Sequence, residues 1–192
     1  MEATVKAAVA KAGHDYMRTA YGEVVWDAVL EMLIPSDSAL VRTIESSPNL
    51  PVAVDGHVFE ALVHVRFGDD RRVVETELRR GGASQADAML DGLFSIFARF
   101  VSPQQAFGRA GSIITSVYSD AVSSSTDTVP GENGGAIHII GLGDSSFVSP
   151  WQCGWIERAV ERFGGRNPRV TERSWEAGRN ASHELVYDVR WD

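Results

Sequence analysis

The hydrophobic period of this sequence changes near Asp120, and that change limits the folds the chain can adopt. Before this point apolar residues recur every three to four positions, which predicts amphipathic helices. After it, apolar and polar residues alternate, which predicts half-buried strands. The first helical stripe is Val5, Val9, Ala12, Tyr16 and Ala20. The clearest alternating run is Leu185, Tyr187, Val189 and Trp191.

Glycine and proline divide the first two thirds of the chain into separate helices. Gly22 interrupts the first stripe, and Pro35 ends the second, because proline cannot continue the helical hydrogen-bond ladder. Ser36 or Asp37 is expected to cap a short third helix that runs through Glu45.

Residues 56–67 fit a buried helix or a strand, because Val-rich runs are ambiguous. Asp69 and Asp70 favour a helix start, and Gly81-Gly82 is expected to end that helix. Ser84 with Asp87 is then expected to cap the next one. That next stripe is Ala86, Met89, Leu90, Leu93, Phe94, Phe97, Phe100 and Val101.

The segment Ser102-Pro103-Gln104-Gln105 predicts a further helix start, with Ser at the cap and Gln three residues later. The tail predicts a hairpin near 121–129 and 136–142, a helix at about 150–164, and two more strands. We therefore expect an α+β fold in which a helical part packs on a small C-terminal antiparallel sheet of ββαββ order. We expect one domain over 1–192, with the helical part at 1–120 and the sheet part at 121–192.

Composition narrows the possible functions. The formal net charge is −8, and an acidic chain without clustered Lys and Arg is a poor partner for nucleic acid. The single Cys excludes an internal disulfide and suits a reducing compartment, so we expect a cytoplasmic protein. No apolar run is long enough for a membrane span, and no signal peptide is visible.

Catalytic and metal-binding patterns are missing from the sequence. The five His residues form no zinc-binding spacing, so we assign no metal and no cofactor. Cys153 lies early in a predicted helix, where the helix dipole lowers a thiol pKa, but it also lies on the apolar stripe of that helix. An inert buried thiol is the favoured interpretation, and a nucleophile is the alternative. We therefore expect no enzyme activity.

Aromatic residues suggest binding instead of catalysis. Phe94 and Phe97 lie on one predicted helix, and Trp151 and Trp155 lie on the helix in the tail. Such side chains wall apolar ligand pockets, although they also fill ordinary cores. We predict these four residues as the ligand-binding set.

Two segments resemble a known superfamily. Tyr21-Gly22-Glu23-Val24-Val25-Trp26 resembles the F/Y-G-E-x-V-W segment that opens heme nitric-oxide-binding (H-NOX-like) domains. The tail from Ser149-Pro150-Trp151-Gln152-Cys153 through Gly164-Gly165 to Val186-Tyr187-Asp188-Val189-Arg190-Trp191 resembles their closing helix and hairpin. That ending is similar to four-vinyl-reductase-like ligand-binding domains, and most similar to an uncharacterised bacterial paralogous family related to both.

The chain departs from the heme-binding pattern in two places. The resemblance implies an axial His on a middle helix, but residues 83–118 contain no His. It also implies a Tyr-x-Ser-x-Arg motif for the heme propionates, whereas Ile139-Ile140-Gly141-Leu142-Gly143 has neither Tyr nor Arg. The usual heme ligation is therefore not expected. Four-vinyl-reductase-like members carry cysteines near the last hairpin, where this chain has Trp175 and His183.

We expect a non-catalytic sensory or regulatory domain that binds a small, largely apolar molecule between helices and sheet, and whose state an unidentified output protein reads. The alternative is a ligand-free, dimeric interaction module with an apolar surface on the first two helices. A second alternative is a tetrapyrrole protein that uses His57, His64 or His138 as ligand. A cavity of roughly several hundred Å³ would favour the sensor, and a flat exposed apolar patch would favour the interaction module.

Overall fold

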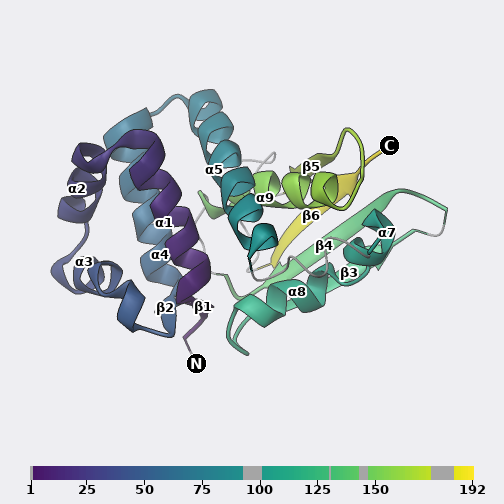
Figure 1. Ribbon diagram of the computed structural model, residues 1–192, viewed down its shortest axis with the longest axis horizontal. Helices are drawn as coiled ribbons and strands as arrows, with labels where there is room; N and C mark the ends of the chain where they lie inside the picture. The colour runs from purple at the N-terminus through teal and green to yellow at the C-terminus, as the bar shows by residue number, and fades with distance from the viewer. Residues whose placement is uncertain (1, 93–100, 130, 143–146, 174–183) are drawn as a thin grey trace.

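The fold is described from a computed structural model of the chain, shown in Figure 1. The structure describes residues 2–92, 101–129, 131–142, 147–173 and 184–192.

The N-terminal part is helical, with one short pair of strands. Its elements are β1 (Thr4–Lys6), α1 (Ala7–Tyr21), α2 (Glu23–Met32), α3 (Pro35–Arg42), a 3-10 turn (Ile44–Ser46), β2 (Asn49–Pro51), α4 (Val52–Leu62) and a π-helical turn (Val63–Phe67). Strands β1 and β2 pair antiparallel, with Val5 opposite Leu50. The first stripe therefore begins as a strand: Val5 is buried through pairing with a distant segment, which a local period does not reveal.

The structure tests three local predictions for this part. Gly22 does separate α1 from α2, in a left-handed conformation with φ +86°. The ambiguous residues 56–67 are helical. The expected cap of the third helix is wrong, because Pro35 is its first residue and Asp37 lies inside α3, where it is hydrogen-bonded to His57.

Helix α5 (Arg71–Asp91) is where the structure differs most from the sequence prediction. Asp70 caps it, as expected, by accepting hydrogen bonds from the backbone N–H groups of Arg72 and Val73. The helix does not end at Gly81-Gly82 but continues to Asp91, 21 residues in all, so the cap expected around Ser84 is also wrong. Both glycines lie where another helix packs directly against α5.

Two short helices follow, α7 (Pro103–Phe107) and α8 (Ala110–Val117). The capping box predicted at α7 is confirmed: Ser102 accepts from the Gln105 backbone N–H, and the Gln105 side chain accepts from the Ser102 backbone N–H. Phe94, Phe97 and Phe100, which the helical stripe also included, lie outside the described residues.

The C-terminal part contains an antiparallel sheet and one long helix. The strands are β3 (Ser123–Thr128), β4 (Gly134–Ile140), β5 (Arg169–Glu172) and β6 (Glu184–Arg190), and α9 (Val148–Arg162) comes between β4 and β5 in the chain. The spatial order of the strands is β3-β4-β6-β5. Ile137 pairs with Tyr187, and Ile139 pairs with Leu185, so these four buried side chains share the face that packs on the core.

Helix α5 joins the two parts. It lies between α1 and α4 on one side and α9 on the other, and α9 in turn packs on β5 (Figure 1). Helix α8 covers β3 and contacts β4. The mixed α+β class expected from the sequence is therefore observed. None of the helices in the described ranges has the length and apolar character needed to cross a membrane.

Candidate functional site

A cavity of about 120 Å³ lies where the helical part meets the sheet part. Helices α1, α4, α5, α7, α8 and α9, together with strands β1 and β4, contribute to its wall. Most of the wall is apolar. Its described apolar residues are Val5, Val9, Phe59, Met89, Leu90, Pro103, Ala106, Phe107, Ala110, Ile113, Ile114, Val117, Ile137, Val148, Trp151, Trp155, Ile156, Ala159, Val160 and Phe163.

Trp151 is the fixed part of this wall. Its ring packs edge-on against Phe59, with ring centroids 4.8 Å apart. Its indole Nε1–H donates to Gln85 Oε1 over 2.8 Å, and Gln85 Nε2 donates to the Val9 carbonyl over 2.7 Å. Both side chains are buried and satisfied, so this chain of hydrogen bonds holds α9, α5 and α1 in one arrangement around the cavity.

Two glycines on α5, which carry no side chains, let α9 approach that helix closely. A Cβ on Gly81 would lie 2.1 Å from the Trp151 ring, and one on Gly82 would lie 1.9 Å from the Trp151 carbonyl oxygen. From the other helix, a Cβ on Gly154 would lie 2.0 Å from the Arg79 carbonyl oxygen. These three glycines are therefore structural requirements of the α5–α9 contact.

One part of the wall is polar. Gln152 Nε2 donates to the Tyr118 hydroxyl oxygen over 3.3 Å, and Asp55 Oδ1 lies 3.0 Å from His14 Nε2. Burial, with the charge of nearby Asp55 as a smaller cause, raises the pKa of Tyr118 far above its usual value. Tyr118 is therefore a neutral phenol at physiological pH. The Gln152 Oε1 atom is buried and accepts no hydrogen bond from any residue that the structure describes.

The structure places the four predicted ligand-binding residues as follows. Trp151 and Trp155 both line the cavity, whereas Phe94 and Phe97 lie outside the described residues. The sequence prediction missed the polar wall, Asp55, Tyr118 and Gln152. Only Gln152 carried a local signal, since it lies one residue after Trp151 in a predicted helix.

Cys153 belongs to a different region. It is 2% exposed and lines a second, polar pocket together with Arg79, Ser149 and Glu172. Burial raises the pKa of the Cys153 thiol to about 12, although the Arg79 charge opposes that rise. Desolvation thus outweighs the attraction of the Arg79 charge, and the favoured interpretation of an inert thiol fits this environment better than a nucleophile does.

The three histidines predicted as alternative tetrapyrrole ligands, His57, His64 and His138, are not part of the described cavity wall. His57 pairs with Asp37, His138 lies between Asp127 and Glu184, and His64 is exposed on the π-helical turn. Within the described ranges, no group of three or more His, Cys, Asp or Glu side chains is arranged to hold a metal ion.

The three-dimensional arrangement is similar to that of solved H-NOX structures. An Fe(II) unliganded H-NOX mutant from K. algicida matches with a TM-score of 0.70 and 10% identity, over 97% of this chain and 96% of that one. An H-NOX mutant from S. oneidensis in the Fe(II) ligation state matches with a TM-score of 0.68 and 11% identity, over 97% of this chain and 96% of that one. An oxygen-binding H-NOX domain related to soluble guanylate cyclases, in its oxygen complex, matches with a TM-score of 0.63 and 13% identity. The match covers 97% of this chain and 95% of that one.

This chain has an H-NOX-like fold. No protein-family model matches its sequence, and no curated protein matches it either. At 10–14% identity the similarity is one of architecture.

The described wall does not fit a heme. Protein ligands to heme iron are His, Cys, Met or Tyr, and the described wall offers only the Met89 thioether and the protonated Tyr118. It contains no Lys or Arg to pair with propionates. A volume of about 120 Å³ is also well below the roughly 300–1,000 Å³ typical of larger ligands. The sequence adds no His in residues 93–100.

Proposed function

We propose that this chain is a non-catalytic sensory or regulatory domain that binds one small, largely apolar molecule in the cavity. The observation that carries this proposal is a hollow with a mainly apolar wall among the buried residues of the hydrophobic core. A dry, apolar cavity of about 150 Å³ binds benzene in another protein. This cavity, at about 120 Å³, suits a ligand of about one six-membered ring.

The volume revises one expectation. A cavity of several hundred Å³ was expected of a sensor, and the observed one is smaller, so the proposed ligand is smaller too. Affinity then comes mainly from removing the ligand's apolar surface from water.

The residues of the cavity wall argue against a catalytic role. His14 and Asp55 form an imidazole–carboxylate pair beside the cavity, which could orient a general base. However, none of the described wall residues is Ser, Thr, Cys or Lys. Burial raises the pKa of the Tyr118 hydroxyl, which makes it a poor nucleophile, so we propose no nucleophile for the pair to activate there.

Signalling requires that the ligand bind two conformations with different affinity. Trp151 is the residue through which occupancy would act, because it borders the cavity and is hydrogen-bonded to α5 through Gln85. An output protein that reads this change, a cytoplasmic location, and the relation to four-vinyl-reductase-like domains and their bacterial paralogues are further parts of the proposal.

Toluene is a suitable probe of the cavity. It should raise the melting temperature, because a ligand that binds only the folded state stabilises it by RT ln(1 + [L]/Kd). The variant Ala110→Leu fills the cavity from α8 and should abolish the shift. Ala8→Leu, on the exposed side of α1, should leave it intact. No shift at near-saturating toluene, with no bound toluene detected by NMR, contradicts the proposal.

The tetrapyrrole alternative has a separate test. Protein purified from cells supplied with a heme precursor should show no Soret band, because the described wall offers no His or Cys as axial donor and no Lys or Arg for the propionates. A Soret band at one heme per chain would restore that alternative.

A second candidate function is a dimeric interaction module, favoured by an exposed apolar patch. Val24 is 84% exposed and Ile34 61%, and Met32 and Leu40 are also exposed. These residues lie on α2, on α3 and between them, whereas the buried apolar residues of α1 are Ala7, Val9, Ala10 and Met17. A second copy of the chain could pair the same patch about a two-fold axis. Concentration-dependent mass in light scattering that Val24→Glu abolishes would support this function, and a monomer at all concentrations would remove it.

A further inference from the structure

In the polar part of the cavity wall, Gln152 presents an unpaired hydrogen-bond acceptor close to the Tyr118 hydroxyl, which can donate. Gln152 Nε2 donates one of its two N–H groups to the Tyr118 hydroxyl oxygen. Gln152 Oε1 is buried, and no described residue donates to it. A buried acceptor without a donor costs about 1–3 kcal/mol, which a suitable ligand group would recover.

Tyr118 supplies the complementary donor. Its hydroxyl oxygen accepts from Gln152, and this is the only hydrogen bond found for that hydroxyl within the described ranges. Its O–H proton is therefore available to a ligand acceptor. Burial keeps this proton in place across the physiological range, because it raises the pKa of Tyr118.

We infer that the cavity recognises a small ring that carries one hydroxyl group, a phenol or a cyclic alcohol, with the hydroxyl between Gln152 and Tyr118. A hydroxyl is both donor and acceptor. It can donate to Gln152 Oε1 and accept from the Tyr118 O–H, while the ring occupies the apolar space beside Trp151. A hydrocarbon of the same size fills the space but leaves Gln152 Oε1 unpaired. This inference rests on the proposed function and names its ligand class.

Three probes of nearly equal size separate the ring from the hydroxyl. Phenol, toluene and fluorobenzene are titrated by calorimetry into the full chain, and affinities are compared as the phenol-to-toluene ratio. In Gln152→Met, which keeps the side-chain length and removes the acceptor, that ratio should fall about fivefold or more. Tyr118→Phe should lower it in the same direction. Gln104→Met, a change at an exposed position on α7, should leave the ratio unchanged.

The possible outcomes test the hydroxyl inference and the proposed function separately. If toluene binds but the ratio is the same in Gln152→Met as in the parent, the hydroxyl inference fails and the apolar cavity stands. Fluorobenzene should follow toluene in every variant, and a fluorobenzene affinity that follows phenol instead also overturns the inference. If none of the three binds, the proposed function itself fails. Because each variant is judged by a ratio of two ligands, a general loss of stability does not imitate the expected result.

Discussion

Cys153 illustrates how burial decides the chemistry of a single residue. Its position in the first half of α9 would favour the thiolate through the helix dipole. In the structure the side chain is buried, and desolvation raises the thiol pKa to about 12. The charged form is then too rare at neutral pH to act as a nucleophile.

A direct consequence is slow modification of this thiol. At pH 8 the native protein should react with iodoacetamide at least about 100-fold more slowly than the chain in denaturant, because the thiolate is both rare and inaccessible. Mass spectrometry of timed aliquots measures the two rates. Equal rates in native and denaturing conditions would mean that Cys153 is accessible, contrary to the structure.

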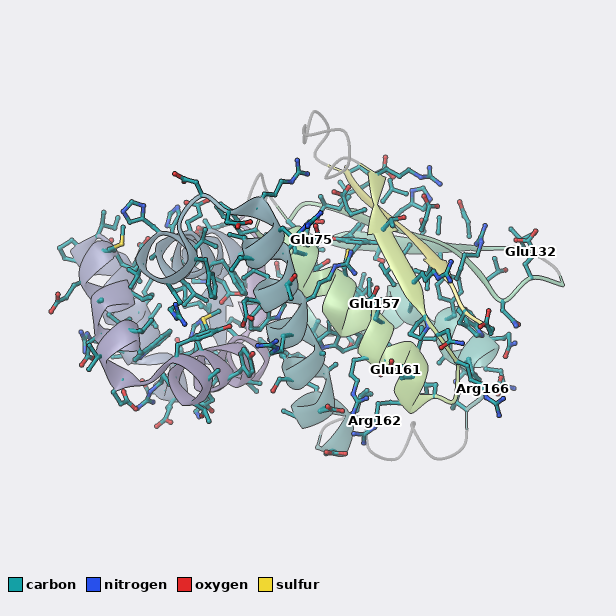
Figure 2. All side chains as sticks on the ribbon, turned by 90° about the horizontal axis from the view of Figure 1, so that it is seen from above. Glu75, Glu132, Glu157, Glu161, Arg162 and Arg166 are labelled. Atoms are coloured by element: carbon teal, nitrogen blue, oxygen red, sulfur yellow. The ribbon has the colours of Figure 1, made fainter. Side chains whose placement is uncertain are left out.

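At the scale of elements, the contact between α5 and α9 organises the molecule. Glycine backbone contact is reinforced by ion pairs along the same seam: Arg79 pairs with Glu75 and Glu157, and Arg162 pairs with Asp87 and Asp91. Figure 2 labels Glu157, Glu161 and Arg162 along α9. The ion pairs are partly exposed and contribute little each, so the close backbone approach is the larger contribution.

Gly82→Ala tests this contact. The added Cβ would lie 1.9 Å from the Trp151 carbonyl oxygen, so the helices must separate, at a cost of about 2–3 kcal/mol in the free energy of unfolding. Chemical denaturation followed by circular dichroism measures the change.

Gly108→Ala is the matched control. Gly108 ends α7 with φ −60°, and an added Cβ would come no nearer than 3.4 Å to its neighbours. The change should be neutral or should stabilise by up to about 1 kcal/mol. A Gly82→Ala variant as stable as Gly108→Ala would show that α5 and α9 do not pack as described.

At the scale of the whole molecule, stability is linked to pH through buried acids. Folding raises the pKa of Cys153 from about 9 to about 12, and burial raises those of Tyr118 and Tyr187 as well. The folded chain keeps these protons while the unfolded chain releases them, so the unfolded state binds fewer protons above pH 9. Stability must therefore fall as pH rises in that range.

The expected result is a loss of up to about 1.4 kcal/mol per pH unit for each group that ionises only on unfolding. For Cys153 this loss should begin near pH 9, and the tyrosines should add to it near pH 10. Urea unfolding at pH 8, 9, 10 and 10.5 measures the slope. A free energy of unfolding that is constant from pH 8 to 10.5 would contradict the burial of these groups.

The amino-acid sequence by itself determined the local features: the α+β class, the Asp70 cap and the capping box at Ser102. These follow from periodicity and backbone chemistry within a few residues. Only the tertiary structure decided that α5 continues through Gly81-Gly82. The cost of about 1 kcal/mol for each glycine in a helix is offset by packing against a helix roughly 70 residues away.

The polar wall of the cavity is also a feature that only the tertiary structure decided. Asp55, Tyr118 and Gln152 come from α4, the end of α8 and α9, and no local period relates them. Whether an amide oxygen is left without a donor depends on every neighbour that packing brings near it. A sequence pattern reports which face of a helix is buried, but the packing of distant elements determines which polar atoms meet there.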